Sequence, residues 1–387
     1  MTTFINIHTL ISHPSSMMNR DDSGLQKTAV FGGTVRSRIS SQCLKRAIRQ
    51  SDIYDDLIKD KSIRTRNYSE LVNYLTKNTE FDKELVENVI KALSIKTGTL
   101  ESSIVFEDEE VEVENDDGKK EKIKTGEKIA SFKTIQSYST AEFEAFVSTA
   151  LEIVPDVFEE VIKGLPPKAK KSEKERFRKI IPEFQSISKV VKSVCDVALS
   201  GRMDTHCGDR NIEAAMSVAH SISTHQADIE IDWFTACDDL AKQGSGHIST
   251  TEFSAGVFYR YGSINLDLLA KNIQMEVSEL SPIINAMVKC FALVTPPAKQ
   301  KVFAAHNIAE FLLITKADLP LSLANAFRKP IENSGDVMEN SIAALVSHYE
   351  KLKDAYDMDS DAIGMDLTGS ANSKTISWVN KISDIQF

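Results

Sequence analysis

FINIHTLISHPSSMMNRDDSGLQKTAVFGGTVRSRISSQCLKRAIR, residues 4–49, holds the clearest local signals of the chain. Residues 3–12 are rich in β-branched and aromatic side chains, which predicts a strand. Residues 13–34 contain one proline and three glycines, which predicts a long loop. Residues 35–39 predict a further extended segment. The two serines that follow it, Ser40 and Ser41, predict the N-cap of a helix.

The helix expected after Ser40 or Ser41 reads QCLKRAIRQS. Leu44, Ala47 and Ile48 have helical spacing and predict a buried face, while basic side chains share another face. Free backbone N–H groups at such a helix start, with hydroxyl, amide and cationic side chains beside them, suit a phosphate. The alternative is a solvated basic face on an ordinary amphipathic helix. The candidate phosphate ligands in this stretch are Lys27, Ser40, Gln42, Lys45, Arg46 and Arg49.

The charge of the chain is unevenly placed. The 387 residues carry a net charge of −10, which argues against indiscriminate binding of nucleic acid. Residues 20–49 nevertheless hold seven basic side chains against two acidic ones, and residues 107–117 hold eight acidic ones. Because screening confines electrostatic effects to about 10 Å, a local basic groove remains compatible with the acidic average.

The five cysteines are scattered and form no CxxC pair, which favours free thiols in a reducing, cytoplasmic setting. No apolar run approaches the roughly 18 residues that span a bilayer, so no membrane contact is expected. The N-terminus has no basic region before its apolar residues, and it therefore reads as a strand rather than a signal peptide.

Two β-hairpins are expected. Residues 104–129 form an acidic arm, a turn at residues 115–118 and a basic arm, so the two arms can pair by charge. Residues 227–261 form a longer hairpin with a wide tip. Trp233 and Phe234 are adjacent and should point to opposite faces, so one of them can be exposed and stack on a base. The alternative is that both lie in the core.

Other signals are weaker. Lys299 and Lys301 follow a Pro-Pro turn and either grip a nucleic-acid backbone or lie in a solvated loop. The segment GVFYRYGSI, residues 256–264, shares the aromatic pattern of RNA-recognition sheets but lacks their glycine spacing. His220 and His225 are five apart, which fits no familiar metal spacing, and they are expected to be structural.

No nucleophile, P-loop, dinucleotide or zinc-protease motif is present, so we expect no catalytic residue, no metal and no cofactor. The helices and strands do not alternate regularly, which favours an α+β fold.

Several blocks of the sequence, in order, resemble the CasC family, the backbone subunit of the type I-E CRISPR surveillance complex Cascade. Besides residues 4–49 they are ALSGRM, AAMSVAHSISTHQ, EIDWFTACDDL, TTEFSAGVFYRY, PPAKQKVFAAHN and PLSLANAF. The resemblance covers most of residues 1–68 and 195–330.

The resemblance implies a modified RRM-like (ferredoxin-like) palm formed by residues 1–68 and 195–330. A hairpin thumb is expected at about 227–261. Residues 69–194 would form a helical fingers region, in which the acidic hairpin at about 104–129 is an insertion. Residues 331–387 would be a C-terminal helical segment packed on the palm.

The resemblance also implies a non-catalytic role in antiviral defence. Copies of the chain would stack in a helical filament along a guide RNA (crRNA), with other Cascade subunits, and the bases would pair with target DNA. The residues that match the family's RNA-binding positions are Asn19, Arg20, Lys27, Ser40, Gln42, Lys45, Arg46, Arg49, Lys299 and Lys301. Those that match positions stacked on bases or wedged in by the thumb are Met203, Trp233, Phe234 and Ile248.

Two features depart from the family pattern. Thr34 stands where a basic residue is common, and the acidic hairpin would repel phosphate, so it is expected to face solvent, a neighbouring copy or another subunit. A metal-dependent ribonuclease on the same fold, using Asp21, Asp22 or His13, is the main alternative function. A scaffold that binds only protein is a third.

Overall fold

In the computed structural model, residues 2–114, 120–166, 168–237 and 245–386 are described. The chain divides into two compact units. Unit 1 comprises Met1–Lys59, Ala215–Lys271 and Met275–Phe387, and unit 2 comprises Asp60–Ala214 and Asn272–Gln274. This division assigns residues 60–68 and 195–214 to unit 2, whereas the sequence analysis grouped them with the palm.

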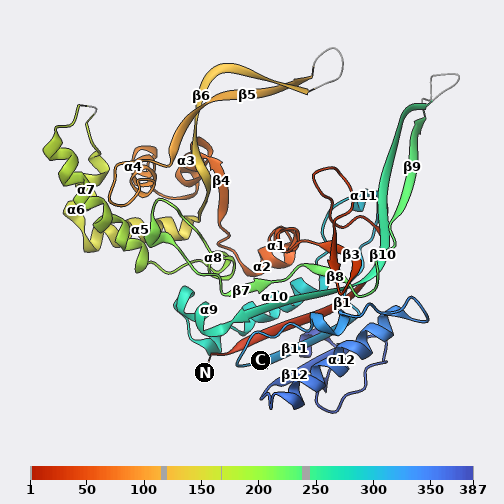
Figure 1. The fold of residues 1–387 in the computed structure, drawn as a ribbon. Coiled ribbons are helices and arrows are strands. Elements are labelled where there is room, and N and C mark those ends of the chain that lie inside the picture. The colour runs from red at the N-terminus through yellow and green to blue at the C-terminus, as the bar shows by residue number, and fades with distance from the viewer. Residues whose placement is uncertain (1, 115–119, 167, 238–244, 387) are drawn as a thin grey trace. The chain divides into compact units, whose positions relative to one another are not determined.

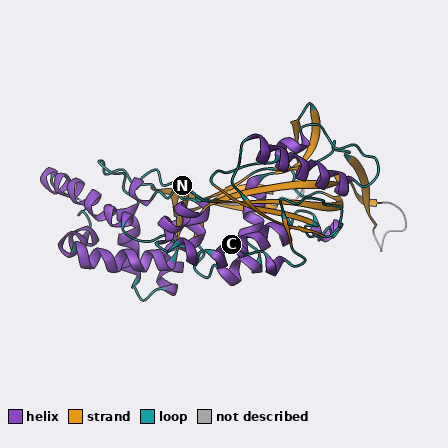
Figure 2. Cartoon of the chain, turned by 90° about the horizontal axis from the view of Figure 1, so that it is seen from below, coloured by secondary structure: helices purple, strands orange, loops and turns teal. Residues whose placement is uncertain are grey.

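Unit 1 is built on one sheet, which is antiparallel except for the β12–β13 pair and is coloured by secondary structure in Figure 2. Its central strands follow the order β11-β1-β10-β8, with α1 and α2 between β1 and β8 along the chain and α9 and α10 between β10 and β11. This is the strand order of a ferredoxin-like βαββαβ unit, as expected. The strands are β1 (Phe4–Ser16), β2 (Thr28–Phe31), β3 (Thr34–Ile39), β7 (Met216–Val218), β8 (Ser221–Ser223), β9 (Glu230–Cys237), β10 (Ser245–Asn265), β11 (Phe311–Ala317), β12 (Asp361–Asp366) and β13 (Ser377–Trp378).

The two faces of the sheet are covered by different helices. Leu10 and Tyr259 point into a core with α12, while their neighbours Ile11 and Phe258 point into a second core with α1. Adjacent strand residues face opposite sides, so α1 and α12 lie on opposite faces. The helices of unit 1 are α1 (Ser41–Arg49), α2 (Asp52–Leu57), α9 (Leu266–Ile273), α10 (Ser281–Leu293), α11 (Gln300–Phe303) and α12 (Val337–Ala355), with 3-10 turns at Val277–Glu279, Ala324–Phe327 and Ile382–Asp384.

Helix α10 packs directly on the sheet at Gly262 of β10. A Cβ atom at this position would lie 2.2 Å from Cζ of Phe291 on α10. A glycine is therefore required for the helix to approach the strand so closely. Gly262 and Phe258 are four positions apart on β10, and alternate residues of a strand share a face of the sheet. Helix α10 therefore covers the same face as α1.

Unit 2 combines helices with a small sheet of order β4-β6-β5. Its core gathers apolar side chains from all its longer helices and from Phe132 of β6. The strands are β4 (Ile63–Asn67), β5 (Ile104–Glu114) and β6 (Lys120–Tyr138). The helices are α3 (Tyr68–Asn78), α4 (Lys83–Leu93), α5 (Thr140–Ile153), α6 (Pro155–Lys163), α7 (Lys171–Ser186) and α8 (Cys195–Ser200), with 3-10 turns at Ile187–Lys189 and Gly208–Arg210.

The hairpin of β5 and β6 forms where the sequence predicted it, although its expected turn at 115–118 lies outside the described residues. The backbone register places acidic residues opposite lysines: Asp108 faces Lys128, Glu110 faces Lys124, Glu112 faces Lys122 and Glu114 faces Lys120. The register therefore agrees with the expected pairing of an acidic and a basic arm.

Two local expectations were wrong. Residues 28–34 belong to a tight β2–β3 hairpin rather than a loop, because Gly32 and Gly33 adopt φ values of +61° and +83° that a primed turn requires. The C-terminal segment 331–387 is only partly helical, since β12 extends the sheet beside β11. Among the described residues, no helix is both long and apolar enough to cross a membrane.

Candidate nucleic-acid interface

Helix α1 begins at the serine cap that the sequence predicts. The Ser40 side chain accepts a hydrogen bond from the Cys43 amide at 3.3 Å, and Leu44, Ala47 and Ile48 are buried. Helical spacing gathers the remaining polar side chains on the opposite face. That polar face consists of Gln42, Lys45, Arg46 and Arg49.

A loop from β1 reaches the start of this helix. The Ser40 amide donates to Oδ1 of Asn19 at 2.9 Å, and the Lys27 amide donates to the Asn19 carbonyl at 2.9 Å. The Arg38 amide in turn donates to the Lys27 carbonyl at 2.9 Å. Asn19 therefore links Lys27 of the loop to Ser40, the N-cap of α1. We call Asn19, Lys27, Arg38, Ser40 and the polar face of α1 the basic cradle.

Several amides at the start of α1 already have partners within the chain, whereas the sequence predicted free amides there. The Ser40 amide is used by Asn19, the Cys43 amide by Ser40, and the Ser41 amide by Nδ1 of His220 at 3.1 Å. A phosphate at the cradle would therefore depend mainly on side-chain donors and cations rather than on these amides.

Arg20 lies in the loop that joins the cradle to β10. It pairs with Gln26, whose amide donates to Oε2 of Glu252 at 2.9 Å. The Gln26 side chain also donates to the hydroxyls of Ser37 and Ser254 at 2.9 and 2.6 Å. These buried contacts fix the loop on β10, at the base of the β9–β10 hairpin.

Lys299 and Lys301 lie in a segment packed beside the same loop. Between them, Gln300 is buried and its Nε2 lies 3.4 Å from the sulfur of Met18, which directly precedes Asn19. Lys299 itself adopts the left-handed conformation, with φ of +53°. The structure thus brings the lysine segment next to the residues that begin the cradle.

The shifted pKa values of two neighbouring groups agree with this grouping of cations. Burial raises the pKa of the Cys43 thiol, and Lys27, Arg260 and Arg46 act against that rise. The pKa of His220 is lowered by burial and by Arg38 and Lys27. Lys27 therefore influences the pKa of both Cys43 and His220, and cations gather at the helix start although the chain as a whole is acidic.

The β9–β10 hairpin projects beyond the sheet as a two-stranded arm (Figure 1). Trp233 is 72% exposed and Ile248 is 63% exposed, so neither lies in a core. The register places Trp233 opposite Thr250, Thr235 opposite Ile248, and Ile231 opposite Glu252. Residues directly opposite each other share a face, so these three apolar side chains share the face of Glu252.

That face is the one that the cradle loop contacts, because Glu252 binds the Gln26 amide. Phe234 lies on the other face, opposite Ser249, and is 41% exposed. The expected tip of the hairpin at 238–244 lies outside the described residues.

The aromatic pattern in GVFYRYGSI serves the core instead. Tyr259 and Tyr261 are buried under α12, and Phe258 is buried under α1. The face of the sheet that these tyrosines occupy is therefore closed to bases at this point.

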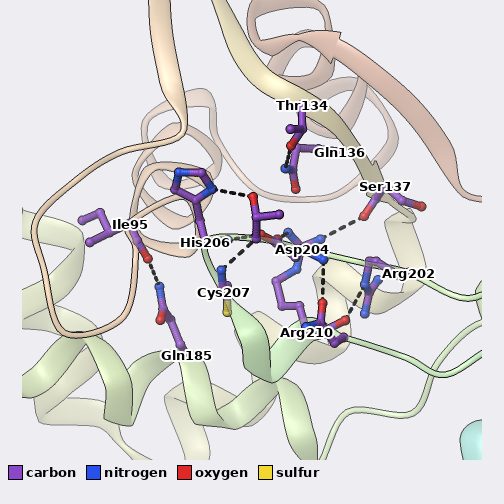
Figure 3. Close-up of polar contacts among 12 residues, drawn as sticks. Ile95, Thr134, Gln136, Ser137, Gln185, Arg202, Asp204, His206, Cys207 and Arg210 are labelled. Carbon is purple, nitrogen blue, oxygen red and sulfur yellow. Dashed lines mark hydrogen bonds and ion pairs between the residues drawn. The ribbon is translucent and has the colours of Figure 1, made fainter.

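Met203 lies in unit 2 and is 83% exposed. Both of its neighbours are held by ion pairs between nearly buried side chains (Figure 3). Nη1 of Arg202 lies 2.5 Å from Oε2 of Glu142, and Nη1 of Arg210 lies 2.9 Å from Oδ2 of Asp204. The backbone is thus anchored on each side of an apolar side chain that faces solvent.

The residues named for a ribonuclease are placed differently. His13 is buried, with Nε2 3.3 Å from Nη2 of Arg260, and burial together with that cation lowers its pKa to about 3. The Asp21 carboxylate accepts the amides of Ser23 and Leu25, each at 2.9 Å, within its own loop. Within the described ranges, no three His, Cys, Asp or Glu side chains are grouped so that they could hold a metal ion.

The fold is similar to those of two solved chains, and this confirms the α+β prediction. One belongs to a structure described as a CRISPR RNA-guided surveillance complex, pre-nicking, with 24% identity and a TM-score of 0.72. The other is described as a CRISPR RNA-guided surveillance complex, with 21% identity and a TM-score of 0.64. Both alignments cover 98% of this chain and 96% of the other.

The family assignment follows from the sequence match. Residues 5–383 match the family described as CT1975-like protein, and the chain belongs to this family. The family resemblance found in the sequence is thereby confirmed. No match was found among curated proteins.

No signal in the sequence indicated that His220 contacts the start of α1. Its spacing to His225 suits no metal, which predicted a structural role. The structure places it between β7 and β8, exposed, and in contact with the start of α1.

Proposed function

We propose that the chain is a non-catalytic backbone subunit of a type I-E CRISPR surveillance complex. Copies would assemble along a guide RNA as a helical filament, together with other subunits, in antiviral defence. Family membership and the likeness to chains of RNA-guided surveillance complexes support this proposal. The free cysteines among the described residues suit a reducing cytoplasm.

The basic cradle is the single observation that carries the RNA-binding part. It concentrates Lys27 and the cations of α1 around one helix start, on a chain whose net charge is −10. Cations grouped in this way bind a polyanion without reading its bases. Arg20, Lys299 and Lys301 would extend the contact along the backbone.

The β9–β10 hairpin supplies the second part. Its exposed Trp233 and Ile248 face the side that the cradle loop contacts, and side chains of this kind wedge between bases or stack on them. Phe234 and Met203 would add apolar contacts. The bases left between such wedges would pair with target DNA, so pairing rather than protein would read the sequence.

The decisive experiment replaces two cations of the cradle, Lys45→Ala with Arg49→Ala, and measures binding of labelled single-stranded RNA by anisotropy. We expect weaker binding, and a slope of log affinity against log salt that is shallower by about 1.4, because each phosphate contact contributes roughly 0.7 on single strands. The matched control is Lys316→Ala with Lys351→Ala, which removes the same charge from exposed positions outside the cradle.

Equal binding by the cradle variant and its control would contradict the proposal. Melting curves of both variants show whether the fold is intact. Incubation of the parent protein with labelled RNA and Mg²⁺ or Mn²⁺ tests the non-catalytic part, for which intact RNA is expected. Cleavage that disappears in an Asp22→Ala variant would instead favour the ribonuclease.

A further inference from the structure

The hydrogen bond between Ser41 and His220 fixes the state of the histidine ring. The Ser41 amide donates to Nδ1 of His220 at 3.1 Å. An amide N–H can only donate, so Nδ1 acts as the acceptor and the neutral ring carries its proton on Nε2. The two ring nitrogens point in different directions, and Nε2 is therefore an N–H donor directed away from Ser41.

The surroundings of the ring keep it neutral and attract an anion. Arg38 of β3 and Lys27 of the cradle loop both act on His220, and with burial they lower its pKa. The residue is exposed, so its outer edge can meet a ligand. A neutral donor with a fixed direction, held beside two cations, suits an oxygen of a phosphate.

We propose that His220 is a further RNA-binding residue, whose Nε2–H donates to a phosphate oxygen of the RNA held in the basic cradle. This inference rests on the proposed function. Lys45 and Arg49 would attract the phosphate by their charge, whereas His220 would orient it through one hydrogen bond. Because its ring is neutral, the contact would release no counterion, so it would add affinity without adding to the salt dependence.

Two substitutions separate this role from simple capping of α1. In His220→Asn the side-chain oxygen takes the place of Nδ1, so the Ser41 contact can persist while the Nε2 donor is lost. In His220→Gln the side-chain amide reaches toward the place of Nε2, so a donor remains while the contact with Ser41 is lost.

The test measures binding of labelled single-stranded RNA to the full chain at several salt concentrations, with a melting curve for each variant. We expect His220→Asn to bind about tenfold more weakly with an unchanged salt slope, as for the loss of one hydrogen bond to a charged acceptor. We expect His220→Gln to keep affinity within about threefold of the parent, since a donor remains near the place of Nε2.

The assignment is overturned if His220→Asn binds as tightly as the parent, or if the loss of affinity in both variants follows their melting temperatures. The Lys45→Ala, Arg49→Ala variant, measured in parallel, separates a failure of the His220 assignment from a failure of the proposed function. If that variant weakens binding and His220→Asn does not, only the role of His220 fails. If neither weakens binding, the proposed function fails.

Discussion

The two long hairpins of the chain, β5–β6 and β9–β10, differ in the residues that stand opposite each other across their strands. The β9–β10 hairpin exposes Trp233 and Ile248, at 72% and 63%. Phe106 of β5 and Ile135 of β6 are exposed to the same extents, 72% and 63%, but beyond Phe106 the backbone register of β5–β6 sets acidic positions opposite lysines. One hairpin thus presents an apolar face, whereas the backbone register of the other sets acidic positions opposite lysines.

This difference indicates which hairpin needs a ligand. Exposed apolar side chains on a projecting arm gain free energy only when something covers them. In the β5–β6 register, acidic positions stand opposite lysines, an arrangement in which opposite charges can pair within the hairpin itself. Because Phe106 and Ile135 are as exposed as Trp233 and Ile248, exposure alone does not separate the two arms. The acidic-to-lysine register of β5–β6, and the contact of Glu252 on β10 with the cradle loop, favour β9–β10 as the arm that contacts RNA.

Low pH should destabilise the sheet from which the β9–β10 hairpin projects more than the sheet that contains β5 and β6. We expect this loss of stability to be the largest effect. His8 and His13 of β1 lie opposite Tyr261 and Gly256 of β10, and burial lowers the pKa of each to about 3, with Arg260 adding to the shift at His13. In the unfolded chain these two histidines have the ordinary pKa of about 6.5 and bind protons below it, whereas in the folded sheet they stay neutral down to about pH 3. The free energy of unfolding therefore falls as the pH is lowered from about 6.5 to about 3.

At pH 5 the loss should be about 2 kcal/mol for each of these two histidines. Hydrogen exchange at pH 7 and pH 5, corrected for intrinsic rates, should show reduced protection in β1 and β10 but not in β6, whose sheet contains no histidine. Equal loss of protection in both sheets would show that the buried histidines are not the cause.

Removing the apolar face should have the next largest effect. We expect Trp233→Ala with Ile248→Ala to weaken RNA binding by about 1–3 kcal/mol, the range for a lost base–aromatic stack. The melting temperature should change little, because both side chains are exposed. Phe106→Ala with Ile135→Ala is the matched control at equal exposure. Similar losses in the two variants would break the comparison.

A charge reversal on the other hairpin should have the smallest effect. Lys128→Glu would place a like charge opposite Asp108, which should destabilise the strand pair by about 0.2–1 kcal/mol. Lys128→Gln, which removes the charge without repulsion, is expected to cost less. Thermal unfolding compares the three proteins, and an increase in stability for Lys128→Glu would show that the pairing does not stabilise this hairpin.

Local sequence patterns predicted most of the elements near the interface. The Ser40 cap, the buried face of α1 and the opposed directions of Trp233 and Phe234 each depend on residues a few positions apart. The β2–β3 hairpin was missed because its Gly32-Gly33 turn was read as part of a long loop.

The aromatic run of β10 shows a different limit. Alternation predicted a strand correctly, but it could not show that α12, about 80 residues later, buries Tyr259 and Tyr261. A helix arriving from a distant part of the chain decides whether such a face is open, and no signal within the strand carries that information.

The sequence by itself determined most of the strands, the cap and polar face of α1, the opposite charges of the two arms of β5–β6 and the family resemblance. Only the tertiary structure decided that Asn19 joins Lys27 to Ser40, and that His220 meets Ser41 from 179 positions away. The physical reason is one of range. Propensity and periodicity act over a few residues, whereas a binding surface is assembled by hydrogen bonds and packing between segments that the fold alone brings together.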